Sequence, residues 1–203
     1  MGGRIILLCF LTIISPFYTG ATSDYNEISN SWTDANLEKT LSRVRRGLET
    51  SQPCCGETFF KSESFLEEMN ECQKLKFQGT DEKNIYACLY ECAGKKLDLV
   101  DEKGFVKQEE FAEFCPEFVE GDKSLQPLVE KIARENLVTG VNNLSKSMRR
   151  QYKCNPAMIF AINNLYFMLQ LTCPDEFKNN TDECNNHRAE IIKMQNAEKG
   201  NKS

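Results

Sequence analysis

The sequence predicts an all-α protein that disulfides staple together. Several segments carry apolar residues at helical spacing, and none alternates apolar and polar residues well enough to be a strand. The chain has 203 residues, a length that favours one domain, and ten of them are cysteines. A polar tail over 199–203 follows the predicted helical domain, which spans 53–198.

The first residues have the pattern of a secretory signal peptide. Arg4 precedes an apolar run over 5–14, Pro16 interrupts the pattern, and small residues lead to Ala21. This predicts a cleaved leader over 1–21 and a secreted, extracellular protein. A retained membrane anchor is the alternative, but the run is too short to span a bilayer.

Charge and hydropathy exclude two classes of partner. The most apolar later segment, 157–171, is interrupted by Asn163 and Asn164, so we expect no membrane insertion. The formal net charge is −5 and no basic stripe is present, which argues against nucleic-acid binding.

Residues 22–52 form a polar arm without cysteines. The arm contains the only tryptophan, Trp32, and has the apolar spacing of a short helix over 36–46. Its basic run, Arg43-Val44-Arg45-Arg46, matches the pattern of secretory processing proteases. Cleavage after Arg46, which would make the arm a propeptide, and a solvated basic face on a flexible arm both fit this sequence.

Cysteines are the strongest structural signal in the chain. Cys9 leaves with the leader, and in an oxidising compartment the others predict a disulfide framework. Zinc is the competing interpretation, but the single histidine and the lack of C-x-x-C pairs argue against it, so we expect no metal site. The number of cysteines that remain is odd, so one thiol stays unpaired or forms a disulfide between two chains. The nine are Cys54, Cys55, Cys72, Cys88, Cys92, Cys115, Cys154, Cys173 and Cys184.

The first half of the domain contains three predicted helices. One lies within 57–75 and carries Phe65, Met69 and Cys72 on one stripe. Asp81 can cap the second, on which Cys88 and Cys92 share a face. A short third helix is expected over 107–114.

The second half contains three more. The pattern predicts an amphipathic helix over 125–148, which Gly140 weakens and can kink. Asn155-Pro156 is a helix start signal, and the segment that follows, through Thr172, is apolar all round, as in a central helix. Cys173-Pro174 ends it, and a last helix is expected over 182–197.

No constellation of residues points to catalysis or to a cofactor. His187 lies among polar residues, so solvated helix surface is the favoured interpretation over a catalytic imidazole. Carboxylate pairs such as Glu67-Glu68 and Glu109-Glu110 are common, and nothing singles one out. In the stretch 98–110, Gly104 matches an EF-hand glycine, but Leu and Lys occupy positions that need oxygen ligands, so we reject a calcium site.

Three sequons for N-glycosylation occur, at Asn143, Asn179 and Asn201. Asn179 lies in a polar loop and is the best candidate, whereas Asn143 falls in a predicted helix.

Phenylalanine and methionine are abundant for a modest helical domain, with 13 and six copies in the chain. These side chains can line an adaptable apolar pocket, or they can simply fill the core. Phe65, Met69, Phe160, Phe167 and Met168 are the candidate pocket residues.

The cysteine order resembles that of the insect odorant-binding proteins. Cys88-x-x-x-Cys92, then Cys173-Pro174 and a further cysteine, Cys184, are similar to the Plus-C subgroup over roughly 54–184. The segment 98–111, with its Gly104, also resembles one that these proteins carry. This family implies a bundle of about six helices around an apolar pocket.

The resemblance also implies how the cysteines pair. The family usually has a cysteine where this chain has Asn164, and its usual partner corresponds to Cys88, so Cys88 is the expected free thiol. Cys92 is then expected to bridge to Cys54, Cys55 or Cys72. Cys173 is expected to bridge to Cys115 or Cys154, and Cys184 to take another of these cysteines.

The implied function is reversible binding of a small apolar ligand, such as an odorant, pheromone or lipid, with a membrane chemoreceptor as a further partner. The alternative is a secreted helical receptor ligand or inhibitor with a filled core, which the processing motif ending at Arg46 motivates. An enzyme comes third, because it needs a polar cleft with perturbed carboxylates.

Overall fold

The computed structural model describes residues 51–75 and 81–199. The predicted leader, Trp32, the processing motif ending at Arg46 and the sequon at Asn201 lie outside these residues. Ser51 and Gln52, which belong to the predicted arm, contact the last helix: both the backbone N–H and the hydroxyl of Ser51 donate to Glu183, and Gln52 donates to the hydroxyl of Thr181.

The described residues confirm an all-α fold stapled by disulfides. Short 3-10 turns over Cys115–Val119, Lys123–Leu125 and Arg149–Gln151 connect the helices, and the described part contains two isolated β-bridges but no strand. The helices are α3 (Glu63–Gln73), α4 (Glu82–Lys96), α5 (Gln108–Phe114), α6 (Gln126–Ile132), α7 (Val138–Met148), α8 (Ala157–Thr172) and α9 (Asp182–Lys199).

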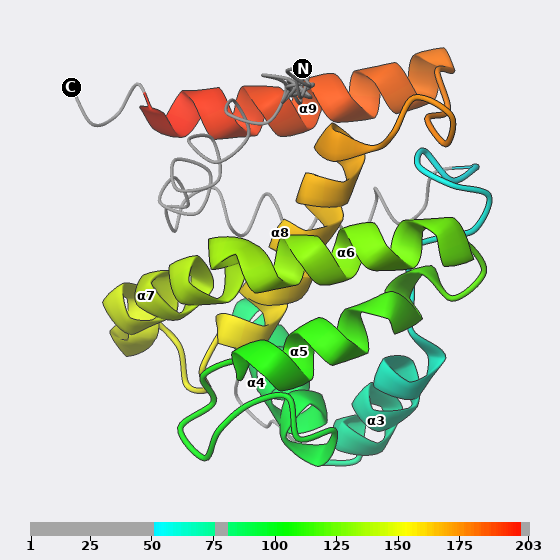
Figure 1. Cartoon of the computed structure of the whole chain (residues 1–203). Helices are drawn as coiled ribbons and strands as arrows, with labels where there is room; N and C mark the ends of the chain where they lie inside the picture. The colour runs from blue at the N-terminus through cyan, green and yellow to red at the C-terminus, as the bar shows by residue number, and fades with distance from the viewer. Residues whose placement is uncertain (1–50, 76–80, 200–203) are drawn as a thin grey trace, which may run out of the picture.

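Helix α8 is the centre of the bundle. Every residue from Ala157 to Gln170 is buried, as the all-round apolar sequence predicts. Figure 1 shows α8 running through the bundle towards α9, which lies across one end, while α3, α4 and α5 gather at the other end. Among the described helices, none is both long and apolar enough to span a bilayer.

Helix α3 lies within the range that the sequence pattern indicates, 57–75, and begins at Glu63. The stretch 51–62 is irregular, and the helix starts where the Ser62 hydroxyl accepts a hydrogen bond from the backbone N–H of Phe65. The expected cap of α4 is confirmed, because the carboxylate of Asp81 accepts from the N–H of Asn84.

The expected helix over 125–148 is broken, but not at Gly140, which lies within α7. The break lies at Glu135 and Asn136, and Asn136 has a φ of +53°. Asparagine tolerates this left-handed conformation better than most residues. The side chain of Gln108 donates to the carbonyl of Arg134 next to the break.

Four disulfides join the described elements: Cys54–Cys184, Cys55–Cys173, Cys72–Cys92 and Cys88–Cys154. The bridge from Cys92 to one of the three early cysteines is therefore confirmed, with Cys72 as the partner. Cys115 is the free cysteine and is buried.

The expectation that Cys88 is free, and that Cys115 is bridged, is wrong. Cys88 lies one helical turn from Cys92 and bridges to Cys154, just before α8, so the pair of cysteines ties α4 to two different neighbours. Cys115 lies in the hydrophobic core, where burial raises the pKa of its thiol well above the ordinary value. The expected partners of Cys173 and Cys184 are also wrong, because both bridge to the irregular segment.

Peptide mapping under non-reducing conditions tests this pairing. We expect the peptide with Cys88 to stay linked to the peptide with Cys154, and alkylation in denaturant without reductant to label Cys115. The same reagent should leave Cys115 unlabelled in the native protein, because its side chain is fully buried. Labelling of Cys88 in denaturant would contradict the assignment.

Candidate functional site

A cavity of about 370 Å³ lies between the irregular segment, the start of α3, α4 and the middle of α8. Aromatic and aliphatic side chains make up most of its lining. The lining residues are Phe59, Phe60, Lys61, Ser62, Phe65, Leu66, Met69, Tyr90, Phe118, Ile162, Asn163 and Tyr166.

The cavity has a buried floor and an exposed rim. Phe65 and Phe118 on the floor are each 3% exposed. Phe59 is 42% exposed and Leu66 is 43% exposed at the rim, and Lys61 beside them is also exposed. A small molecule could therefore enter from solvent and leave water behind as it reaches the floor.

The irregular segment forms one wall of the cavity, and Asp122 holds it in place. The carboxylate of Asp122 accepts hydrogen bonds from the N–H of Glu57, at 2.8 Å, and from the N–H and hydroxyl of Thr58. Gly56 has a φ of +84°, and a Cβ there would lie 2.7 Å from a carboxylate oxygen of Asp122. The sharp turn and the close approach thus both need glycine.

Stacked rings bind this wall to the floor. The rings of Phe60 and Phe118 are nearly parallel, with centroids 4.8 Å apart. Phe65 extends the cluster to Tyr90, with centroids 5.4 Å apart. Burial raises the pKa of Tyr90 to about 12, so its hydroxyl is neutral at physiological pH.

His187 is not on a solvated surface, as the sequence pattern suggests. It is half-buried, and its Nε2 lies 2.8 Å from the hydroxyl of Tyr166, which lines the cavity. The reason is that α9 crosses the end of α8 (Figure 1), and the contact between the two side chains joins these helices. Burial lowers the pKa of His187 and raises that of Tyr166, so both are neutral at physiological pH.

Two of the five predicted pocket residues, Phe65 and Met69, line the cavity. The other three are buried elsewhere, because α8 is apolar on all sides and only one of its faces meets the cavity. Phe160 packs edge-on against Tyr152, Phe167 packs with Ile191 of α9, and Met168 lies in the main core.

The sequence pattern did not predict most of the other residues that line the cavity. Ile162, Asn163 and Tyr166 lie on the cavity face of α8, but most residues around this helix are apolar, so the pattern does not indicate which face that is. The sequence indicated Phe59 and Phe60 only through the high phenylalanine content of the domain.

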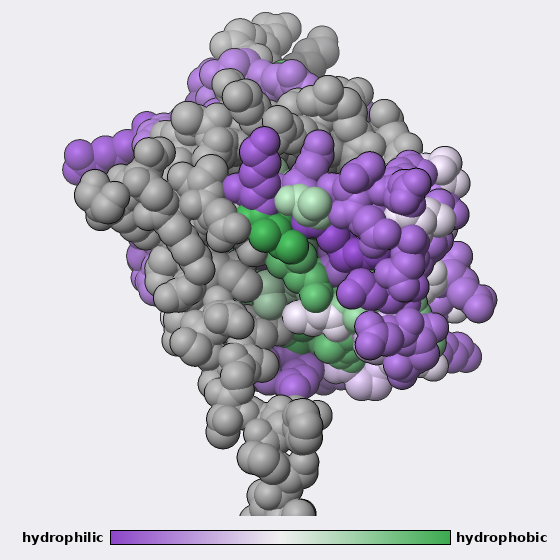
Figure 2. All heavy atoms as spheres, turned by 90° about the horizontal axis from the view of Figure 1, so that it is seen from above, coloured by the Kyte–Doolittle hydropathy of each residue, from purple (hydrophilic) through white to green (hydrophobic). Residues whose placement is uncertain are grey.

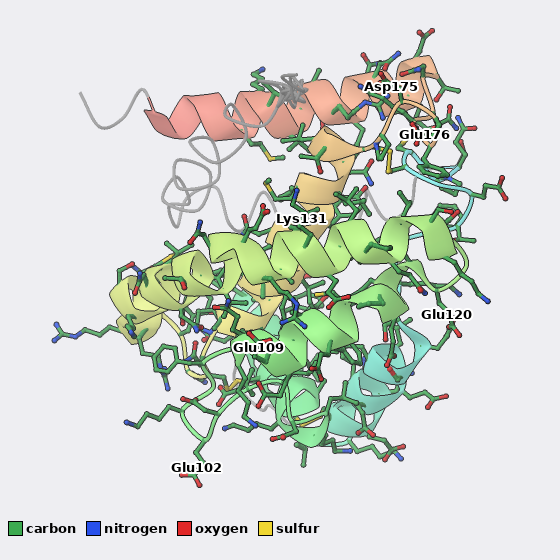
Figure 3. The ribbon with its side chains drawn as sticks, in the orientation of Figure 1. Glu102, Glu109, Glu120, Lys131, Asp175 and Glu176 are labelled. Atoms are coloured by element: carbon green, nitrogen blue, oxygen red, sulfur yellow. A yellow bond between two sulfur atoms is a disulfide. The ribbon has the colours of Figure 1, made fainter. Side chains whose placement is uncertain are left out.

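The charged residues do not converge on the cavity. Figure 3 shows Glu102, Glu109 and Glu120 on different elements and well apart. In the loop that resembles an EF-hand, Asp98 pairs with Lys107, and Asp101 accepts from the N–H of Phe105. Among the described residues, no group of His, Cys, Asp or Glu side chains could hold a metal ion.

Asn179, the predicted glycosylation site, is partly buried. Its side-chain nitrogen, the atom to which a glycan would attach, donates to the carbonyl of Pro53 at 3.2 Å. A glycan would have to displace this hydrogen bond. Asn143 is exposed on α7.

Seen from above, the described surface is mostly hydrophilic, and apolar side chains gather near the middle of the view (Figure 2).

Besides the main hydrophobic core, a smaller buried apolar cluster lies where α8 meets α9 and contains Tyr166, Phe167 and Ile191. Tyr166 belongs both to this cluster and to the cavity lining, so α9 supports the cavity from outside.

Comparisons with protein-family models, curated proteins and solved structures found no match for this chain. The resemblance to insect odorant-binding proteins therefore rests on the cysteine pattern and on the segment with Gly104.

Replacement of Asp122 by alanine should loosen the cavity wall. The variant leaves the N–H groups of Glu57 and Thr58 without their acceptor, and we expect a loss of about 1–2 kcal/mol in the free energy of unfolding. Urea titration measures this loss. Asp175→Ala, which removes an exposed carboxylate, is the control and should change stability by less than about 0.5 kcal/mol. Equal effects of the two variants would refute the role of Asp122.

His187 should make stability depend on pH. Because its pKa is lower in the folded protein, its contribution is fully present above the unfolded-state value of about 6.5. As the pH falls below that value the unfolded chain takes up a proton first, so stability falls until the folded-state pKa is passed. Urea titrations from pH 7.5 to 5 should show a steeper loss in the wild type than in His187→Gln. Parallel profiles would disprove the assignment.

Proposed function

We propose that this protein is a secreted carrier of the insect odorant-binding type, which reversibly holds a small apolar ligand in the cavity. The observation that carries the proposal is the cavity itself, a space of about 370 Å³ with a buried aromatic floor and a rim open to solvent. A cleft of this size with a mostly apolar lining has the usual form of a small-molecule site.

The volume indicates the size of the ligand. An engineered apolar cavity of roughly 150 Å³ holds a benzene ring. On that scale, 370 Å³ accommodates on the order of fifteen non-hydrogen atoms. A micromolar dissociation constant then needs about 0.5 kcal/mol per atom, which lies within the range that small ligands reach.

The disulfides support the extracellular part of the proposal. Four bridges in the described residues are typical of an oxidising compartment, and the signal-peptide pattern agrees with that location. A membrane chemoreceptor is the further partner that this type of carrier implies. The proposal needs no catalytic step and no cofactor.

A receptor ligand or inhibitor is the alternative, and it expects a filled core. The cavity favours the carrier, because exposed apolar residues at its rim continue into a buried floor instead of forming a flat contact surface.

Displacement of a fluorescent apolar probe from the oxidised protein tests the carrier function. We expect saturable binding at one site in the wild type. Met69→Trp fills part of the cavity from its partly buried wall and should weaken binding at least about tenfold, which corresponds to 1.4 kcal/mol.

The matched control is Ile192→Trp, which places the same bulky ring at a 47% exposed position on α9, away from the cavity lining. It should bind the probe as the wild type does. If the folded wild type shows no saturable binding, or if both variants bind equally well, the carrier proposal is wrong.

A further inference from the structure

One polar side chain on the cavity lining is left without a partner. Asn163 of α8 is 5% exposed, and its side-chain nitrogen has no hydrogen-bond acceptor in the described structure. This residue lines the cavity beside Ile162 and Tyr166. An unpaired amide donor in an apolar site is costly, because it has lost its hydrogen bonds to water and gained none in return.

Three other polar groups on the cavity lining already have protein partners. The Ser62 hydroxyl caps α3, and Lys61 at the rim pairs with Glu63. The Tyr166 hydroxyl contacts His187. Among the fully buried side-chain nitrogen and oxygen atoms of the described lining, the nitrogen of Asn163 is the one without a partner, and a ligand could complete it.

Its neighbour on α8 provides an internal comparison. Asn164 is also 5% exposed, but its side-chain nitrogen donates to the carbonyl of Phe160 at 2.9 Å, and the residue does not line the cavity. Two adjacent buried asparagines thus use their amides differently: one donates to the backbone of its own helix, and the other donates to no protein group.

We propose that Asn163 donates a hydrogen bond to a carbonyl oxygen of the ligand, so that the cavity takes apolar ketones, aldehydes or esters in preference to hydrocarbons. This inference rests on the proposed carrier function. A carbonyl oxygen accepts a hydrogen bond and brings no donor of its own, which suits a floor built from Phe65, Phe118 and Ile162.

A carboxylate fits the floor less well. It would bring a negative charge into an apolar space, and the one cationic side chain on the lining, Lys61, lies at the exposed rim and is paired with Glu63. The ligand class is therefore a neutral molecule with one accepting oxygen.

The test measures displacement of the same fluorescent probe by three ligands with about ten carbons: a straight alkane, the matching methyl ketone and the matching carboxylate. Each ligand is compared between wild type and Asn163→Leu, which cancels differences in ligand solubility. We expect the ketone to bind about fivefold more weakly to the variant, as for the loss of one hydrogen bond. The alkane should bind equally well or better.

Asn164→Leu is the matched control, and it should leave the ratio of ketone to alkane affinity unchanged. If Asn163→Leu fails to fold, infrared spectroscopy of a ketone bound to the wild type still tests the hydrogen bond. The infrared carbonyl band of an isotope-labelled ketone should shift to lower frequency on binding, relative to its position in an alkane solvent.

The outcomes separate the two proposals. Absence of saturable binding of every ligand to the folded wild type would overturn the carrier function itself. Binding in which Asn163→Leu affects ketone and alkane equally, or in which the bound carbonyl band does not shift, would overturn the role of Asn163 alone. The role of Asn163 would also be overturned if the carboxylate bound most tightly of the three ligands and if Lys61→Gln abolished this preference.

Discussion

The cavity depends on two adjacent disulfides that hold an irregular segment against the helices. Cys54 bridges to Cys184 in α9, and Cys55 bridges to Cys173 at the end of α8. These bridges close loops of 130 and 118 residues, and a single cross-link of that length stabilises a fold by roughly 4–5 kcal/mol in the chain-entropy model. The segment 51–62 has no helical hydrogen bonds of its own, so it needs such outside support.

Support from several sides explains why the wall can leave a space beside it. Asp122 fixes the turn after Gly56, and the stacked rings of Phe60 and Phe118 join the wall to the floor. On the opposite side, the bridges of Cys72 and Cys88 hold α3, α4 and the start of α8 together. A bundle held in this way can keep a void that packing forces alone would tend to close.

The sequence revealed the parts of this fold that depend on local signals. The burial of α8 follows from its largely apolar composition, and Asp81 caps α4 as its position before that helix suggests. Features set by distant residues could not be predicted: the non-helical wall needs Asp122, more than sixty positions away, and the burial of His187 needs Tyr166. The cavity face of α8 was hidden for the same reason, since the neighbours that leave it open come from three other parts of the chain.

The central claim is that a ligand occupies the space beside the irregular wall and nowhere else in the core. Methyl NMR of methionine-labelled, oxidised protein tests this claim most directly, because an aromatic ligand shifts the signals of the methyl groups that it contacts. Met69 lines the cavity, whereas Met158 and Met168 are buried in the core away from it. We expect the Met69 signal to shift on titration while the other two stay in place. Shifts of Met158 or Met168 without Met69, or no shift at saturating ligand, would contradict the account.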